Sequence, residues 1–506
     1  METDKMVKAM ARWWQTVKED DHDAGARNPM LYDPLTENNV KTTKLMQYVA
    51  TFVVCLGAIS AGTALAWSSP VLPQMTAPNV TINVNSTGQN LTTTDGELYL
   101  TPDQKTWVSS LLAIGAFFGA IPTGVIADAI GRKYTALVMD IPFIVAWTTL
   151  IFADSPGALY FGRFMVGIST GSFCVVAPMY ISEIAETNIR GTLGTFFQLS
   201  LTIGILLVYL IGSMVPWRTL STLCLFLPVA LFITMFLLPE TPTYLLKKGR
   251  RGDAALSLKW LWGKYCDSRS AIQIIQADLD SSSGEASLSD LYYQKANRKG
   301  IMISLALMLF QQFSGINAVI FYTVPIFQAA GSSLDPAVCS IIVGVVQVIM
   351  TFASSLLIDR AGRKILLIFS STVMAICLAI LGSYFDMKAE GKDVSHIGWL
   401  PLLCVVMFIV TFSVGYGPIP WLMMGELFLP DIKGTAVSVS VMFNWAMVFV
   451  VTKSFDSMME NWGSDMTFWF FAVCMVGGSY FVHKVVFETK GRSAGQIQMM
   501  LEGRPL

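Results

Sequence analysis

The sequence is poor in charge, in histidine and in paired cysteine. Only 14% of its 506 residues are Asp, Glu, Lys or Arg, whereas soluble domains carry about 25%. The histidines, His22, His396 and His483, are too dispersed for a ligand set, and eight cysteines are scattered without a CxxC pair. We therefore expect no metal site, no disulfide framework, no catalytic constellation and no cofactor. The formal net charge of −1 gives no sign of a nucleic-acid partner.

Long hydrophobic runs fill most of the chain, whose mean hydropathy is +0.55. A run of about 20 apolar residues can cross a bilayer as a helix. The runs lack the polar faces at helical spacing that a soluble all-α protein shows. We therefore expect an all-α membrane protein with twelve transmembrane helices in the lipid bilayer. The runs lie at 45–67, 106–127, 134–153, 157–181, 192–213, 217–238, 301–330, 337–358, 365–387, 397–424, 434–456 and 465–487.

Orientation follows from the positive charges. With the N-terminus inside, 28 of the 34 Lys and Arg residues lie in cytosolic segments. The loop after the first run, which this topology places outside, contains three glycosylation sequons, at Asn79, Asn85 and Asn90. No signal peptide is expected in the first 44 residues, which lack an apolar stretch followed by a cleavage site. We expect a multi-pass protein of the plasma membrane with both termini in the cytosol.

Three charge motifs occur twice, in the same order, at offsets of 231, 243 and 248 residues. They are Asp128 to Lys133 with Asp359 to Lys364, Glu183 to Arg190 with Glu426 to Lys433, and Glu240 with Glu488. This repetition predicts two six-helix pseudo-repeated bundles. We divide the chain into a cytosolic tail (1–44), a first bundle (45–238), a cytosolic linker with short helices (239–299), a second bundle (300–487) and a cytosolic tail (488–506). Alternatively, part of the first tail lies on the membrane surface, because Met6, Met10, Trp13, Trp14 and Val17 share one helical face.

The repeated charges are expected at the cytosolic helix ends. Positive-inside anchoring explains the Lys and Arg residues but not the paired acids. We predict an ion-pair latch between helices and between halves, closed when the cytosolic side is shut, because a network of weak pairs can bias a two-state equilibrium. The set of gate and ion-pair residues is Asp128, Arg132, Lys133, Arg163, Glu183, Arg190, Glu240, Asp359, Arg363, Lys364, Glu426, Lys433 and Glu488.

Four further motifs carry a family resemblance over residues 45 to 500. They are the GRK loops at Arg132 and Arg363, Pro-Glu-Thr-Pro at 239–242, Gln-Gln-Phe-Ser-Gly-Ile-Asn at 311–317, and Gly-Pro-Ile-Pro-Trp at 417–421. With these motifs the chain resembles the sugar porters of the major facilitator superfamily. Within that family, residues 418–426 and 443–445 are similar to insect facilitated trehalose transporters. Vertebrate glucose carriers of the intracellular class are similar, but less so.

Three amides in one apolar run, Gln311, Gln312 and Asn317, suit a sugar. Unpaired polar groups are costly in a membrane, and amides both donate to and accept from hydroxyl groups. Ser314 and Gly315, which lie between Gln312 and Asn317, weaken the helix there, and the prolines at 418 and 420 weaken the tenth span in the same way. The neighbouring Trp421 offers an aromatic face to a sugar ring. The alternative for each amide is a bond to a neighbouring helix, and for each tryptophan plain packing. The resemblance adds Gln198, Gln347, Ser413, Asn444 and Trp445 to the binding residues.

Two departures from the family concern the mechanism. Proton-coupled members pair an acid in the first helix with an arginine in the fourth, and Arg163 matches that arginine. Residues 62–67 of the first run contain no acid, which favours uniport over proton symport. Asp140, about two turns inside the third run, is an intramembrane acid and so a functional candidate; the alternative is a partner near the cytosolic edge. Ser413 stands where many glucose carriers have glutamate, which points to a larger or differently held sugar.

We therefore predict a facilitative sugar transporter, for trehalose, that works by alternating access and functions as a monomer. A glucose or other monosaccharide facilitator and a proton-coupled sugar symporter are the alternatives. A non-transporting sugar sensor and a membrane-embedded enzyme are less favoured.

Overall fold

The computed structural model describes residues 43–76, 98–186, 189–281, 294–331, 334–428, 430–490, 492 and 494–504. In this part of the chain, 12 spans are long and apolar enough to cross a membrane. The all-α, twelve-span fold predicted from the apolar runs is therefore confirmed. The tail up to residue 42 and the sequons at Asn79, Asn85 and Asn90 lie outside the described residues.

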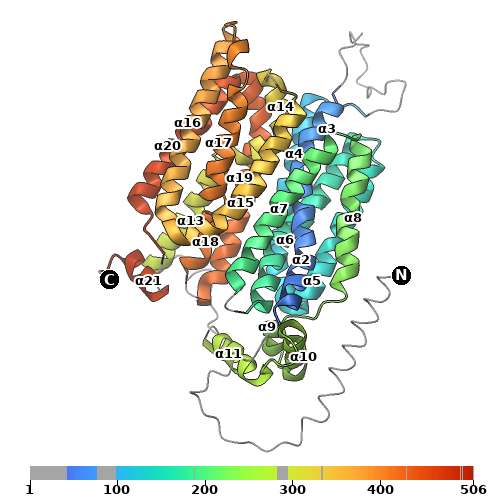
Figure 1. The fold of residues 1–506 in the computed structure, drawn as a ribbon, viewed down its shortest axis with the longest axis vertical. Helices are drawn as coiled ribbons and strands as arrows, with labels where there is room; N and C mark the ends of the chain where they lie inside the picture. The colour runs from blue at the N-terminus through green and yellow to red at the C-terminus, as the bar shows by residue number, and fades with distance from the viewer. Residues whose placement is uncertain are drawn as a thin grey trace, which may run out of the picture.

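The first six spans form one bundle, drawn from blue to green in Figure 1. Its helices are α2 (Leu45–Ala66), α3 (Ser68–Gln74), α4 (Pro102–Ile130), α5 (Arg132–Ile151), α6 (Pro156–Ile184), α7 (Arg190–Gly212) and α8 (Trp217–Met235). Helices α2 and α3 belong to one span and are separated only by Trp67.

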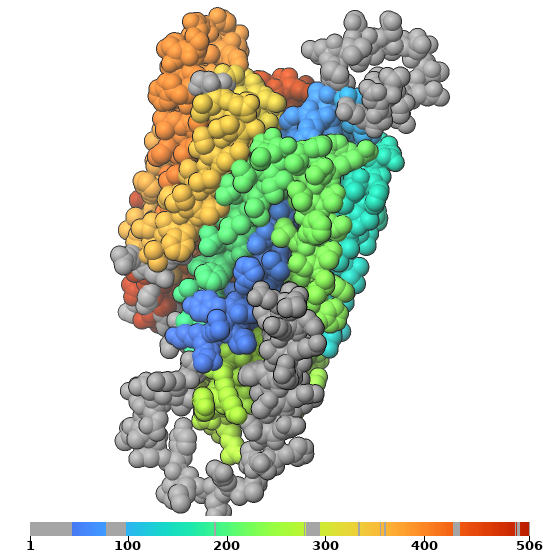
Figure 2. Space-filling model, turned by 45° about the vertical axis from the view of Figure 1, so that its right-hand side comes forward, coloured from blue at the N-terminus to red at the C-terminus, as the bar shows by residue number. Residues whose placement is uncertain are grey.

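Three short helices follow the first bundle and lie together at one end of it (Figure 1). They are α9 (Pro242–Lys247), α10 (Arg251–Trp262) and α11 (Ser268–Ser281). Apolar side chains of α11, among them Ile272 and Ile275, pack on Leu245 of α9 and Ala254 of α10. Figure 2 shows this group projecting beyond the bundle. We call this the linker end of the molecule, and the opposite end the far end.

The second bundle, drawn from yellow to red, stands beside the first (Figure 1). Its helices are α13 (Lys295–Gln312), α14 (Ile316–Ala330), α15 (Pro336–Ala361), α16 (Arg363–Ala389), the short 3₁₀ helix η2 (Ser395–Ile397), α17 (Leu400–Val414), α18 (Ile419–Glu426), α19 (Pro430–Asn461) and α20 (Ser464–Val485). A last helix, α21 (Ala494–Glu502), lies at the linker end, where Gln498 donates a hydrogen bond to the Leu427 carbonyl at 3.0 Å.

Glycines allow close packing of helices within the first bundle. A Cβ atom on Gly115 of α4 would lie 2.1 Å from the Phe164 carbonyl oxygen of α6, and one on Gly62 of α2 would lie 2.0 Å from the Leu201 carbonyl oxygen of α7. Small residues at such crossings are typical of membrane helices, where close backbone approach supplies the packing energy.

Two spans of the second bundle are interrupted where the sequence predicted weak helix. Gly315 adopts φ = +82°, a left-handed conformation that ends α13 and begins α14. Residues 415–418 separate α17 from α18, and Pro420 lies in the first turn of α18. The predicted discontinuous helices are therefore confirmed, and both breaks lie inside the second bundle.

Candidate functional site

The predicted amides form one hydrogen-bonded chain around the break in the seventh span. Asn317 Nδ2 donates to Gln312 Oε1, and Gln312 Nε2 donates to Gln311 Oε1 at 3.4 Å. Asn444 of α19 donates to the same Gln311 oxygen at 2.9 Å. Gln311, Gln312 and Asn444 are buried, whereas Asn317 is partly exposed. The structure thus brings four of the predicted binding residues together, from three helices.

Gln311 also bridges the two broken spans. Its Nε2 donates to the carbonyl oxygens of Tyr416 and Gly417, at 2.7 and 3.0 Å. The Tyr416 carbonyl would normally accept from the backbone nitrogen four residues later, which here is Pro420 and has no hydrogen. Gln311 therefore satisfies a carbonyl group that the proline leaves free. The structure therefore shows the helix-to-helix bond for Gln311, and its part in sugar binding stays a prediction.

The other predicted binding residues are less connected. Gln347 of α15 and Trp445 of α19 are buried, and within the described residues Gln347 Oε1 and Trp445 Nε1 have no hydrogen-bond partner. Ser413 is buried at the end of α17, two residues before the break begins. Gln198 of α7 and Trp421 of α18 are partly buried. Within the described structure, these five residues form no hydrogen bond with one another or with the amide chain.

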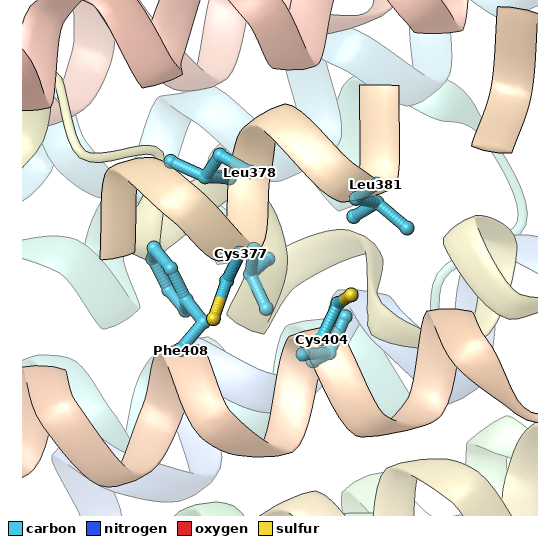
Figure 3. A pocket seen from close by; sticks show the side chains of 7 residues that line it. Cys377, Leu378, Leu381, Cys404 and Phe408 are labelled. Atoms are coloured by element: carbon cyan, nitrogen blue, oxygen red, sulfur yellow. The ribbon is translucent and has the colours of Figure 1, made fainter. Parts of the chain in front are cut away.

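A small cavity lies between α14, α16 and α17, and Figure 3 shows side chains that line it. The side chains around it are apolar or thiol groups: Val319, Cys377, Leu378, Leu381, Cys404, Val405 and Phe408. No side chain there can donate or accept the strong hydrogen bonds that sugar hydroxyls need. The cavity therefore lacks the polar groups of the amide chain and is not part of the candidate sugar site.

At the linker end of the first half, the repeated charges form a compact cluster. Arg132 contacts Asp128 at 3.1 Å and Glu183 at 2.8 Å. Glu240 accepts the backbone N–H groups of Arg132 and Lys133, at 3.0 and 3.1 Å, where α5 begins. A carboxylate at this place satisfies helix N–H groups that have no partner within the helix.

The second half repeats this geometry. Arg363 contacts Glu426 at 3.0 Å, and Glu488 accepts the backbone N–H groups of Arg363 and Lys364, at 2.9 and 3.0 Å. Thr489 donates to Glu426 at 2.6 Å, as Thr241 donates to Glu183 in the first half. The duplicated motifs thus fold into duplicated ion-pair and capping arrangements.

The two capping acids differ in their electrostatics. Burial raises the pKa of Glu240, against the effect of its backbone hydrogen bonds, and the neighbouring Glu183 charge raises it further. Burial also acts to raise the pKa of Glu488, but the N–H groups of Lys490, Arg363 and Lys364 and the Arg363 charge outweigh it. The pKa of Glu488 is therefore lowered.

The geometry departs from the predicted latch in several respects. The ion pairs just described join helices of one half, and the contact between halves that the latch requires when the cytosolic side is shut stays a prediction. Lys133 and Lys364 donate to backbone carbonyls, of Phe236, Leu238 and His483. Arg190 is exposed, and no described residue forms an ion pair with it. The side chains of Asp359 and Lys433 lie outside the described residues.

Arg163 does not belong to the linker-end clusters. It lies in the second turn of α6, near the far end, and is fully buried. Its guanidinium donates to the carbonyl oxygens of Val108 at 2.9 Å and Ala64 at 2.8 Å, and lies 5.3 Å from the Trp67 ring centroid. Two backbone carbonyls and an aromatic ring therefore contact the arginine, whose Nη2 has no hydrogen-bond partner among the described residues.

Asp140 is fully buried in α5, and both of its carboxylate oxygens lack a hydrogen-bond partner within the described residues. The expected partners at the edge are engaged elsewhere, Arg132 with Asp128 and Glu183, and Lys133 with carbonyl groups. One turn further along α5, Phe143 stacks on Phe173 of α6, with ring centroids 5.8 Å apart. Asp140 therefore lies inside the first bundle.

Sequence reasoning missed the contacts that close the far end, which centre on the second turn of α14. Pro325 cannot donate to the Phe321 carbonyl, and Ser68 of α3 donates to it instead, at 3.3 Å. Tyr322 departs from helical geometry there, with φ = −121° and ψ = 22°. The Val324 N–H donates to Ser69 Oγ at 3.1 Å rather than to the Ile320 carbonyl.

The freed Ile320 carbonyl accepts from the Tyr209 hydroxyl of α7 at 2.7 Å. The kink in α14 thus exposes backbone groups that the first half satisfies, and so the halves are joined at the far end. Pro325 was the only sequence signal for this kink, and nothing in the sequence identified its partners.

Comparison with known proteins agrees with this architecture. Residues 50–501 match the family model described as sugar (and other) transporter. The facilitated trehalose transporter Tret1 of Drosophila yakuba is 42% identical over 462 residues, which are 90% of this chain and 52% of that protein. Tret1 of Drosophila virilis is 41% identical, over 90% of this chain and 49% of its own length. The chain thus spans about half the length of these curated relatives.

Solved structures support the fold. The xylose transporter XylE from E. coli, in a partially occluded inward-open conformation, matches with a TM-score of 0.73. The sequence identity is 24%, over 89% of this chain and 100% of that one. Two six-helix bundles with broken spans and repeated charge clusters, together with the family match over nearly the whole chain, lead to one conclusion: the chain belongs to the sugar (and other) transporter family.

Proposed function

We propose that this protein is a facilitative carrier of trehalose in the plasma membrane. The observation that carries the proposal is the amide chain of Gln311, Gln312, Asn317 and Asn444, buried in apolar spans beside two helix breaks. The relatives named above, facilitated trehalose transporters at 41–42% identity, support the choice of sugar.

The amide chain suits a neutral polyol. Each amide has both donors and acceptors, so a sugar hydroxyl can replace an amide-to-amide bond without creating a charge. The buried oxygen of Gln347 and the indole N–H of Trp445, which lack partners among the described residues, offer one further acceptor and one further donor. Trp421 supplies an aromatic face for the apolar side of a sugar ring. The site therefore recognises hydroxyl groups and not charge.

The surroundings of Arg163 support uniport. In a proton-coupled carrier of this type, an acid near this arginine would exchange a proton during the cycle. Here carbonyl groups of Val108 and Ala64 and the ring of Trp67 surround the guanidinium. Sugar therefore moves down its own gradient, and the protein has no catalytic role.

The orientation follows from the positive charges, which place the linker end, both termini and α9–α11 in the cytosol. The far end then faces outward and is the closed end in this structure. In the opposite state, the linker-end clusters of the two halves approach each other and form the predicted latch. The halves rock around the amide chain in alternating access, as a functional monomer.

Uptake of labelled trehalose into liposomes that contain the purified protein tests the proposal. We expect uptake faster than into empty liposomes, and a loss of about tenfold or more in Gln311→Leu, which strands the Tyr416 carbonyl and removes the centre of the amide chain. Gln498→Leu is the matched control, since Gln498 also donates to a backbone carbonyl, but at α21. Trehalose uptake equal to that of empty liposomes would refute the substrate.

A monosaccharide facilitator is the second candidate, because amide-lined sites accept many polyols. Labelled glucose in the same liposomes separates the two. Faster glucose than trehalose uptake, abolished by the same Gln311 substitution, would assign the site to a monosaccharide.

A further inference from the structure

At the far end, two helices from different halves, α4 and α19, lie side by side. Along the chain, α4 carries an acid followed by a base, and α19 carries a base followed by an acid. Asp103 and Lys105 stand in the first turn of α4, and Lys453 and Asp456 in the last turns of α19. The Lys453 ammonium lies 3.0 Å from Asp103, although 350 residues separate them in the chain. This ion pair joins the two halves.

The lysine of this pair is held more firmly than the aspartate. Its ammonium lies 4.2 Å from the ring centroid of Trp107, one turn along α4 from Asp103. The Lys453 side chain is 26% exposed, whereas Asp103 is 77% exposed. A cation over an aromatic face keeps a favourable contact when partly desolvated. Lys453 is therefore bound to α4 by both a carboxylate and a ring.

The second charge of α19, Asp456, is an acid near a base of α4. Asp456 lies within electrostatic range of Lys105 of α4 and near the Tyr322 hydroxyl of the kinked α14. Tyr322 is also hydrogen-bonded to Ser109 of α4, and its ring lies 5.2 Å from that of Phe455.

The remaining charges near Asp456 are those of its own helix, Lys453 and Glu460. Lys105 is additionally fixed by a 2.7 Å bond to Thr76.

We propose that Asp103, Lys105, Lys453 and Asp456 form a reciprocal charge clamp that holds the far end closed and sets the balance between the two transport states. Each helix presents one acid and one base to the other, so the attraction between α4 and α19 is lost if one helix slides along the other or moves away from it. The clamp rests on alternating access, but not on which sugar is carried.

The expected strength of the clamp suits a gate. A half-exposed ion pair such as Lys453–Asp103 shifts an equilibrium by at most about fivefold. The attraction between Asp456 and Lys105, which form no direct ion pair, is weaker still, and so the clamp can open in every cycle. Replacing attraction with repulsion at one pair should therefore change the state populations measurably without unfolding the protein.

The test is a distance measurement between spin labels across the far end. Labels at Met214→Cys and Glu390→Cys, both exposed, are placed in the full chain with its eight native cysteines replaced. Lys453→Asp faces Asp103 with a like charge, and we expect the far-open distance to gain about fivefold in population relative to the closed one. Lys453→Asp with Asp103→Lys restores an attractive pair and should restore the original distribution.

Asp154→Lys is the matched control, because Asp154 pairs with Arg218 at 3.1 Å at the same end but within one half. It should leave the distribution unchanged. An unchanged distribution in Lys453→Asp, or a double variant that stays far-open, contradicts the clamp. If the parent protein shows both distances and Lys453→Asp does not alter their ratio, the clamp is wrong while alternating access stands.

Discussion

Glu240 and Glu488 occupy equivalent positions in the two halves, and each accepts the first backbone N–H groups of a helix. Their pKa values nevertheless shift in opposite directions, because burial dominates at Glu240 and hydrogen bonds dominate at Glu488. An acid with a lowered pKa stabilises the folded state above its ordinary pKa, 4.5 for glutamate, and loses that contribution as the pH falls. An acid with a raised pKa instead destabilises the folded state above its ordinary pKa, and this cost disappears as the pH falls.

Glu488→Gln should therefore lower the free energy of unfolding at pH 7 by about 1 kcal/mol, since a charged acceptor of three N–H groups becomes neutral. The loss should shrink as the pH falls below 4.5, where the parent glutamate is itself being protonated. Glu240→Gln, the matched substitution, should cost little or nothing at pH 7. Thermal unfolding in detergent at pH 7 and pH 4 measures both, and a larger loss at pH 7 in Glu240→Gln would contradict the assignment.

Asp140 presents the opposite case, a buried carboxyl group without a partner among the described residues. Replacing an unsatisfied buried polar group by an apolar one of similar shape removes a desolvation cost of about 1–3 kcal/mol. We therefore expect Asp140→Leu to raise Tm and to leave sugar uptake intact. A lower Tm together with lost uptake would show that the carboxyl group has a function in the transport cycle.

At the scale of elements, each break in a helix frees backbone groups that another helix satisfies. Pro420 frees the Tyr416 carbonyl for Gln311, and Pro325 frees the Phe321 carbonyl for Ser68. The first contact lies within the second half, whereas the second joins the two halves. Helix α14 connects the candidate binding residues to the far-end contacts, because it begins at Gly315 beside the amide chain and contains the kink at Tyr322.

Gly315→Ala tests the break that begins α14. Its φ of +82° is strained for any residue with a Cβ atom, and the added carbon would lie 3.3 Å from the Phe471 ring. We expect a cost of about 1–2 kcal/mol in unfolding free energy and slower sugar uptake. Gly124→Ala in α4 is the control, because nothing lies within 4 Å of its added Cβ, and it should not lower the unfolding free energy, since alanine is the better helix former. Equal behaviour of the two variants would contradict a required left-handed residue at 315.

At the scale of the whole molecule, local features were predictable and long-range pairings were not. Apolar runs, Gly315 and Pro418 act on their immediate neighbours, so the sequence alone predicted twelve spans and two of the breaks. The amides of residues 311–317 lie within two turns of one another, and their clustering was predictable for the same reason.

The partner of a surface charge depends on the complete fold instead. Arg132 and Glu183 pair within one half here, and their part in a latch between the halves stays a prediction for the other transport state. Lys453 pairs with Asp103 at the far end, across 350 residues of sequence, and no repeated motif marked either residue. Tyr209 was equally unmarked, because its carbonyl partner becomes free only when α14 kinks.

The central claim is that sugar moves down its own gradient through this fold, without a coupled proton. The most direct test measures the internal concentration of labelled trehalose in liposomes that contain the protein, once with equal pH on both sides and once with an acidic external buffer. We expect the internal concentration to reach the external one and no more, at the same level in both conditions, since carbonyl groups rather than an acid surround Arg163. Accumulation above the external concentration when the outside is acidic would contradict the claim.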